Sequence, residues 1–271
     1  MFRNFFVFCS AAAMLAAPHV FAADCSDVPN AGELKSLLAR APNDGGDEGG
    51  MFHGKQEWAV TVNRNGELCA IAASQSDMGK MWPGSLSIAE AKAYTANAFS
   101  TDDKPLSTAR LYTLTQPGHS LWGIAASNPF NPTALEPVSQ APGTSPQKIA
   151  AGMISFGGGV PLYKNGKIIG ALGVSGDTSC TDHETAKRMR ALANLNPPGG
   201  PGVDDISYPS VDGPSAFSHP LCQNTYRNGH FLGNEALPTF DQLPATISTA
   251  EQQTAQKPGA RAAVAQKNTK Q

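Results

Sequence analysis

The residues best suited to chemistry in this 271-residue chain are its cysteines and histidines. Cys9 lies in an N-terminal segment that we expect to be removed, which leaves Cys25, Cys69, Cys180 and Cys222. None of them forms a CxxC pair, so the sequence gives little support to a zinc site or a thioredoxin-type redox site. Four cysteines allow three disulfide connectivities, and spacing does not choose between them. We expect two structural disulfides.

An acidic cluster surrounds one histidine. Asp177, Asp182 and Glu184 lie close to His183 in the sequence, and this set could bind a hard or borderline metal ion, with His183 and Asp182 as ligands. The alternative is that Asp182 only caps a helix.

Three consecutive glycines, Gly157, Gly158 and Gly159, lie between two predicted strands. Without side chains they could leave backbone N–H groups facing a bound ligand. The alternative is a tight crossover between strands that needs positive φ angles. The run matches neither the GxGxxG nor the GxxxxGK[ST] phosphate fingerprint, which disfavours nucleotide binding. No GxSxG elbow follows it, which disfavours a serine hydrolase.

The ends of the chain differ from its body. Residues 1–22 have a basic start and an apolar stretch of about 13 residues that ends in small residues, which predicts a signal peptide and a periplasmic or secreted protein. Residues 244–271 lack aromatic residues and a periodic apolar face, which predicts a disordered tail. The net charge of −2 and scattered basic residues disfavour nucleic-acid binding, and no apolar run is long enough for an integral membrane segment.

Between these ends, the pattern predicts strands joined by hairpins. Asn-Gly turns at Asn65-Gly66 and Asn165-Gly166 each separate two apolar runs. The predicted strands are residues 58–62, 68–73, 150–156, 160–163 and 168–174. Helices are predicted over 32–41, from a capping box at 87–90 to about 99, and from a second capping box at 181–184. The expected fold class is α+β, with an antiparallel five-stranded sheet flanked by helices.

Four motifs, in this order, resemble those of a known family. They are the helix SIAEAKAYTANAFS, then GGGVPLY, then IIGALGVSG, then an acidic residue that opens a helix. Together they are similar to the extracellular heme-binding proteins, a family that includes the glycolate-operon accessory protein and the C-terminal domain of a corrinoid adenosyltransferase. The resemblance implies a profilin-like or PAS-like domain over residues 23–195, a homo-oligomer, and heme or a related tetrapyrrole as the bound cofactor.

The stretches around Trp82, His119, Cys180 and Cys222 resemble an exported branch with a longer C-terminus. That branch suggests a Cys180–Cys222 disulfide, which ties a Pro/Gly-rich extension (196–243) beside the third helix and leaves Cys25–Cys69 as the other bond. Each closed loop of about 40 residues contributes on the order of 3–4 kcal/mol in a chain-entropy treatment.

Heme iron needs an axial ligand, most often histidine, and the porphyrin needs apolar walls. His183, in the first turn of a helix, and His219, three residues before Cys222, would share one neighbourhood if the disulfide forms. They are the preferred heme-binding residues, although His183 could instead cap its helix. His119, before Leu121 and Trp122, and His53, in a glycine-rich loop, are further candidates that could equally be turn or surface residues.

Two functions follow. The first is a non-enzymatic exported protein that sequesters, carries or senses heme or a related tetrapyrrole. The second is an accessory protein or enzyme that acts with a metal or corrinoid in the oxidation of a small hydroxy acid or alcohol. The chain shows no recognisable nucleophile–base pair, which favours binding over catalysis.

Overall fold

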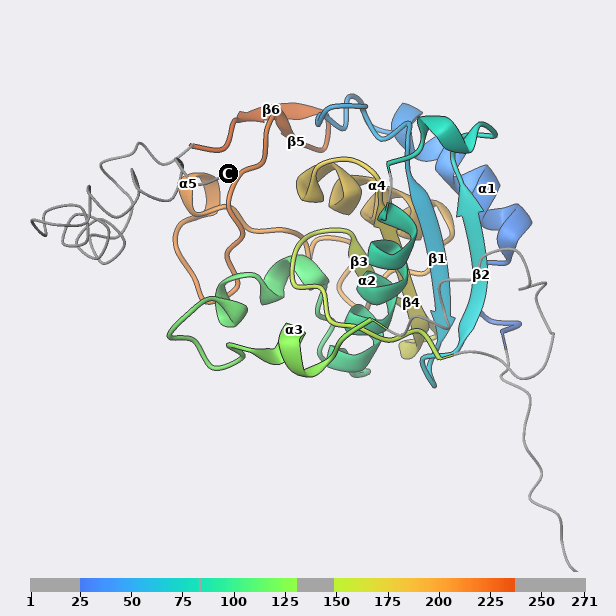
Figure 1. Ribbon diagram of the computed structural model, residues 1–271, viewed down its shortest axis with the longest axis horizontal. Helices are drawn as coiled ribbons and strands as arrows, with labels where there is room; N and C mark the ends of the chain where they lie inside the picture. The colour runs from blue at the N-terminus through green and yellow to red at the C-terminus, as the bar shows by residue number, and fades with distance from the viewer. Residues whose placement is uncertain (1–24, 83, 131–148, 237–271) are drawn as a thin grey trace, which may run out of the picture.

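A computed structural model describes residues 25–82, 84–130 and 149–236 of the chain. The predicted signal peptide and tail lie outside these residues. Four antiparallel strands form one sheet in the order β2-β1-β4-β3. Their bounds are β1 Trp58–Asn63, β2 Leu68–Ala73, β3 Gly159–Lys164 and β4 Lys167–Ser175. Figure 1 shows the sheet with the helices packed around it.

The predicted fifth strand, residues 150–156, is wrong. This segment is irregular up to β3. At its start, an isolated antiparallel bridge pairs Ile149 with Glu67, in the turn before β2. Its polar backbone is satisfied from elsewhere: Ile154 N–H donates to Thr95 Oγ1, and Thr108 Oγ1 donates to the Phe156 carbonyl. Side chains of neighbouring elements have therefore taken the place of a strand partner.

Both predicted Asn-Gly hairpins are confirmed. Asn165 and Gly166 have φ of 52° and 76°, the left-handed pair that a two-residue turn requires between β3 and β4. In the β1–β2 hairpin, Gly66 has φ of 81° and the Asn63 side chain accepts from two turn N–H groups. Local residue chemistry is sufficient to set these turns.

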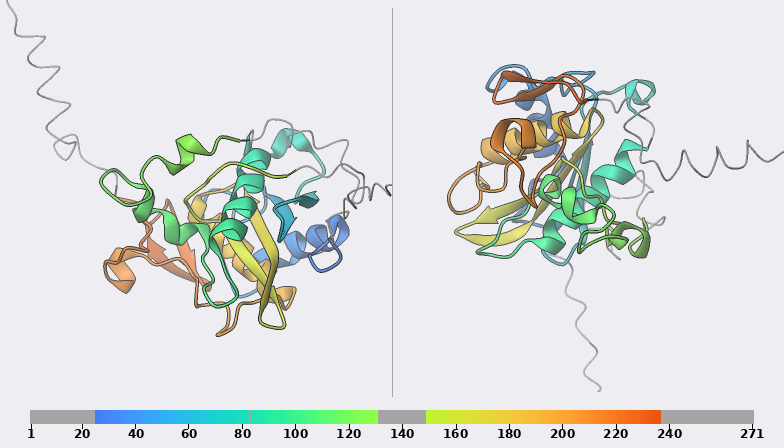
Figure 2. Two further views of the ribbon diagram at one scale, coloured as in Figure 1. Left: turned by 90° about the horizontal axis from the view of Figure 1, so that it is seen from below. Right: turned by 90° about the vertical axis from the view of Figure 1, so that its left-hand side faces the viewer.

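Helices cover both faces of the sheet, as Figure 2 shows. Helix α2 (Ser85–Phe99) packs Ala89, Ala93 and Ala96 against Val60 and Val62 on one face. On the other face lie α1 (Ala31–Arg40) and α4 (Ser179–Leu192). This second layer buries an apolar cluster that includes Leu34, Leu38, Leu162, Leu172, Val174, Ala186 and Met189. Successive residues of a strand face opposite sides of the sheet, so the strands contribute to one apolar core on each face.

The two capping boxes predicted for the later helices are wrong in position. The N-cap of α2 is Gly84, three residues before Ser87, and α4 begins at Ser179, where Thr178 Oγ1 accepts from Thr181 N–H. The buried Asp182 and Glu184 side chains are held by Lys92 and Arg188 and do not cap their own helix in the predicted way.

Short elements complete the described chain. The 3-10 turns are Ala41–Asn43, Met78–Lys80, Thr108–Leu111 and Thr113–Thr115, and the one-turn helices are α3 (Ile124–Ser127) and α5 (Pro209–Asp212). The extension adds a hairpin of β5 (Thr225–Arg227) and β6 (His230–Gly233). Its turn is again Asn-Gly, with φ of 51° and 77° at Asn228 and Gly229. No helix in the described ranges is long and apolar enough to cross a membrane.

Both disulfides are present in the structure, Cys25–Cys69 and Cys180–Cys222. The second fastens the extension to the start of α4, where Cys180 and Cys222 pack with Ala109, Ile206 and Tyr208 in a third apolar cluster. A bidentate ion pair between Arg190 and Asp204, at 2.6 and 2.8 Å, holds the extension to the other end of α4.

The capping box of α1 allows a test of local stability. The Asn30 side chain accepts from the N–H groups of Gly32 and Glu33, and the Glu33 carboxylate accepts from Asn30 N–H. We expect Asn30→Ala to lower the free energy of unfolding by about 1 kcal/mol, measured by urea denaturation. Ser36→Ala, on an exposed position of the same helix, is the control and should cause no comparable loss.

Candidate heme-binding site

A pocket of about 400 Å³ lies where α2, the start of α4 and the extension meet. We call it the aromatic pocket, because Trp82, Tyr112 and Phe156 line it. The other apolar lining residues are Met51, Ile88, Pro220 and Leu221. Met51 and Trp82 are about half exposed, so this side of the pocket faces solvent. The walls are of the kind that a flat macrocycle needs.

His219 lies in the wall of this pocket and is 2% exposed. Its Nδ1 lies 2.7 Å from the Pro220 carbonyl oxygen, which can only accept, so Nδ1 carries the proton. Nε2 is then the unprotonated nitrogen, and it accepts only long contacts of 3.4 Å from Gly157 N–H and from Ser179 Oγ. Burial lowers the pKa of His219 to about 4. The imidazole is therefore neutral at physiological pH, as a metal ligand must be.

His183 borders the same glycine from the other side but is differently engaged. A side chain at Gly157 would collide with the Ser179 carbonyl and with Cβ of His183. Because Gly157 N–H also contacts His219, the two histidines lie on the same glycine, close to the disulfide. However, His183 Nε2 lies 3.1 Å from Asp205 Oδ1 and 3.2 Å from Ile206 N, and His183 is not among the residues that line the aromatic pocket. It fastens α4 to the extension.

The other two predicted histidines lie at the surface. His53 is exposed, has φ of 53° and pairs with Asp47 at 2.8 Å. His119 is exposed in the turn before α3. Neither of them lines the aromatic pocket.

The glycine run serves close packing. A Cβ on Gly158 or Gly159 would overlap the backbone of Val174 or Lys92. Gly158 also has φ of 119°, which disfavours other residues. These two glycines therefore allow the start of β3 to pack closely against α2 and β4. This is the tight crossover that was the alternative to a ligand-binding loop. Phe156, immediately before the run, is the residue that faces the pocket.

The predicted metal pair, His183 and Asp182, is already used within the protein. Asp182 Oδ2 lies 2.6 Å from Lys92 Nζ, and its Oδ1 accepts from the N–H groups of Gly176 and Asp177. Burial raises the pKa of Asp182 to about 6, against the opposing effect of Lys92. Asp182 joins α2 to the start of α4, and it lines the aromatic pocket next to Phe156.

Sequence reasoning missed most of the pocket wall. The Tyr112 ring packs at a tilt against the His219 ring, with centroids 4.9 Å apart, and Leu221 and Pro220 come from the extension. Tyr112 follows a run without clear periodicity, and nothing in the sequence marked it as a wall residue. Trp82 belonged to a motif of the resemblance, so its place in the wall could have been predicted.

Comparison with known proteins agrees with the resemblance. Residues 53–191, just over half of the chain, match the family described as haem degrading protein HbpS-like. No curated protein matches the chain. Several solved structures are similar at low identity, among them the following three.

The first is a complex of PduOC with heme, 23% identical, which covers 61% of this chain and 94% of its own, with a TM-score of 0.41. The second is Klebsiella pneumoniae protein ORFY, 23% identical, which covers 60% and 87%, with a TM-score of 0.40. The third is a double mutant of Streptomyces reticuli HbpS, 19% identical, which covers 68% and 98%, with a TM-score of 0.37. On the family match over residues 53–191, the chain belongs to the HbpS-like family of haem degrading proteins.

Proposed function

We propose that this protein binds heme in the aromatic pocket and that, as an exported protein, it sequesters, carries or senses that cofactor. The observation that carries the proposal is the position of His219, a neutral buried imidazole with an unprotonated Nε2, in a pocket walled by Trp82, Tyr112 and Phe156. Membership of the HbpS-like family supports heme as the cofactor.

His219 would supply the axial ligand. The hydrogen bond from Nδ1 to the Pro220 carbonyl fixes the ring and its tautomer, which is the support that a ligating histidine usually has. The two contacts at Nε2 are 3.4 Å long, so little hydrogen-bond energy is lost when an iron replaces them. His183 is the less suitable ligand because it does not line the pocket and its Nε2 donates to the Asp205 carboxylate.

The acidic side chains of the pocket predict how the macrocycle would be oriented in it. Asp177, Asp182 and Glu235 line it, and no lysine or arginine is among the described lining residues. Heme propionates are anions, so we expect the propionate edge to point to solvent and the apolar edge to enter between Trp82 and Phe156. When bound, the iron supplies redox chemistry and ligand binding, while the chain holds the macrocycle and limits its access to water.

A hemin titration tests the proposal. Mature protein should give a saturable one-to-one Soret shift at micromolar hemin, and His219→Ala should weaken the affinity at least tenfold. His53→Ala and His119→Ala replace exposed histidines outside the pocket and should leave the affinity unchanged. The absence of a Soret shift for the wild type would rule out the function. An unchanged affinity for His219→Ala would leave the function standing and refute the ligand.

The pocket wall gives a second prediction. Trp82→Ala removes a large aromatic wall and should weaken hemin binding about threefold to tenfold, because the loss of a partly exposed ring contact costs on the order of 1 kcal/mol. Trp122→Ala is the matched control: this tryptophan is 65% exposed and is not a lining residue. Equal effects of the two substitutions would contradict the placement of heme in this pocket.

The family description favours a second candidate function, the degradation of heme. Hemin-loaded protein exposed to air and ascorbate separates the two. A Soret band that decays faster than that of free hemin indicates degradation, and a protected band indicates carriage or sensing. The accessory role with a corrinoid in hydroxy-acid or alcohol oxidation stays a prediction, as does the homo-oligomer, which light scattering of the mature protein would test.

A further inference from the structure

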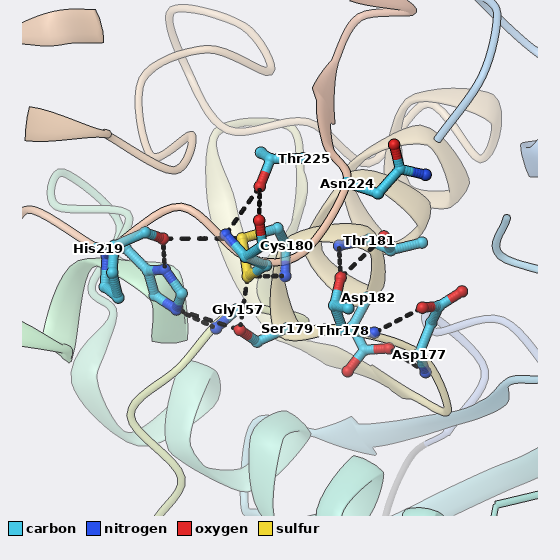
Figure 3. Close-up of a disulfide and its surroundings, with 12 residues drawn as sticks. Gly157, Asp177, Thr178, Ser179, Cys180, Thr181, Asp182, His219, Asn224 and Thr225 are labelled. Carbon is cyan, nitrogen blue, oxygen red and sulfur yellow. Dashed lines mark hydrogen bonds between the residues drawn. A yellow bond between two sulfur atoms is a disulfide. The ribbon is translucent and has the colours of Figure 1, made fainter. Parts of the chain in front are cut away.

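Cys180, His219 and Cys222 form a group of metal-binding residue types at the edge of the aromatic pocket. Their donor atoms all lie within 4.8 Å of one another, and all three residues are buried. Cys180 is the second residue of α4, whereas His219 and Cys222 belong to the extension. Figure 3 shows Ser179 next to both the His219 ring and the disulfide, with Gly157 beside the ring.

When the disulfide is reduced, two hydrogen-bond donors can stabilise the Cys222 thiolate. The Cys180 backbone N–H donates to Cys222 Sγ at 3.1 Å, and Ser179 Oγ lies 3.3 Å from the same sulfur. Both donors belong to the first turn of α4, whose N-terminus favours negative charge. A thiolate that accepts such hydrogen bonds leaves readily in thiol–disulfide exchange, and Cys222 lines the aromatic pocket, from which a reductant can approach.

His219 is already oriented as a third ligand. Its Nδ1–H donates to the Pro220 carbonyl, so its Nε2 carries the free lone pair. Ser179 Oγ lies 3.4 Å from Nε2 and 3.3 Å from Cys222 Sγ, next to two of the three donors. A hydroxyl or water can therefore complete a four-coordinate site.

We propose that the Cys180–Cys222 disulfide conceals a metal site, and that on reduction the two thiolates and His219 Nε2 bind one Zn²⁺. A dithiol supplies the two electrons and two protons: the S–S bond breaks, the dithiol becomes a disulfide, and Cys180 and Cys222 become thiols. Zinc then displaces both thiol protons to solvent and forms two Zn–S bonds and one Zn–N bond. The donor set of two sulfurs and one imidazole suits a borderline metal.

The required movement is small. Tetrahedral zinc with Zn–S bonds near 2.3 Å separates two sulfurs by roughly 3.7 Å. Because bonded sulfurs lie about 2 Å apart in any disulfide, they must part by under about 2 Å once the covalent bond has gone. The α4 backbone can stay in place because Cys222 lies on an irregular segment. The second disulfide provides an internal control, since Cys25 and Cys69 belong to no such group within the described residues.

The test uses mature protein without hemin, so its result does not depend on the proposed heme function. Protein is reduced anaerobically with a phosphine, its four thiols are counted, and Co²⁺ is added as a spectroscopic substitute for zinc. Reduced protein should bind one Co²⁺ with thiolate charge-transfer and tetrahedral d–d bands, which Zn²⁺ then removes. Oxidised protein should show neither band.

Three variants locate the site. The double variant Cys25→Ser/Cys69→Ser should keep the Co²⁺ spectrum, whereas Cys180→Ser/Cys222→Ser should lose it. His219→Ala should weaken Co²⁺ binding at least tenfold and alter the d–d bands. Near-UV circular dichroism follows the fold in every sample. The proposal is overturned if reduced protein with four free thiols binds no Co²⁺, if Cys180→Ser/Cys222→Ser still binds it, or if binding occurs only once the near-UV signal is lost.

Discussion

Lys92→Met should destabilise the protein by about 3–5 kcal/mol, because it leaves a buried carboxylate without its counter-charge. Lys92 is fully buried in α2, and its Nζ lies 2.6 Å from Asp182 Oδ2 and donates to the Val174 carbonyl at 3.1 Å. It reaches Asp182 past Gly158, whose missing side chain leaves the space. The ammonium also lies 4.9 Å from the centroid of Phe156. Urea denaturation at pH 7.5 measures the loss.

A double-mutant cycle separates the pair from its packing. Asp182→Asn leaves Lys92 buried and unpaired and should also be strongly destabilising. The double variant Lys92→Met/Asp182→Asn removes both charges, so it should be clearly more stable than the sum of the single losses predicts. Lys167→Met, at an exposed ion pair with Asp102, is the matched control and should cause no comparable loss, because exposed ion pairs contribute little to stability. Additive losses in the cycle would show that the ion pair itself contributes nothing.

Glu57→Gln should stabilise the protein at pH 8 and flatten the dependence of stability on pH, because a neutral amide avoids the cost of ionising a buried carboxyl. Glu57 is fully buried. Thr185 Oγ1 lies 3.3 Å from Glu57 Oε1 and 2.9 Å from Glu48 Oε2, so the two carboxyls share this hydroxyl. Burial, together with the charges of Asp182 and Glu48, raises the pKa of Glu57 well above 4.5. Burial likewise raises the pKa of Glu48 to about 7, although Arg188 opposes this effect.

Proton linkage determines whether stability rises or falls with pH. A carboxyl whose pKa is raised in the folded protein binds more protons there than in the unfolded chain, so folding loses stability as pH rises from about 4.5 through the folded pKa. A tenfold difference in proton affinity between the folded and unfolded states corresponds to about 1.4 kcal/mol. Asp205 acts in the opposite sense: despite its burial, hydrogen bonds from His183 and Lys187 lower its pKa, so its contribution is lost only in acid, below about pH 4.

Urea denaturation from pH 5 to pH 8 measures this slope. Wild type should lose stability across that interval, and Glu57→Gln should lose less. Glu235→Gln makes the same chemical change at an exposed position and should reproduce the wild-type slope. A Glu57→Gln profile parallel to that of the wild type would show that Glu57 is already ionised at pH 5 or stays protonated throughout.

The fold was largely predictable wherever neighbouring residues decide the structure. The Asn-Gly turns at 65–66 and 165–166 and the apolar periodicity of α1 and α4 require no knowledge of distant contacts. The prediction of a fifth strand was wrong because residues 150–156 include strand-forming residues, yet the hydroxyls of Thr95 and Thr108 pair with the Ile154 N–H and the Phe156 carbonyl in place of a strand partner. A side chain that is distant in sequence cannot be anticipated from the strand itself.

The site was predictable in its parts. His219 and the pairing of Cys180 with Cys222 came from the sequence and its family resemblance, and the structure places them together. The sequence could not rank His219 against His183, because the difference lies in Asp205, which pairs with Nε2 of His183.

The sequence by itself determined the turns, the helices and the family, because these depend on residue type and local order. Only the tertiary structure decided what the glycine run does, which histidine faces a pocket, and that two cysteines without a CxxC motif share a ligand group with His219. The physical reason is that burial and hydrogen-bond partners belong to side chains 40 or more residues apart, such as Ser179 with His219 and Lys92 with Asp182. Folding creates those environments, and they set the charge and reactivity of each group.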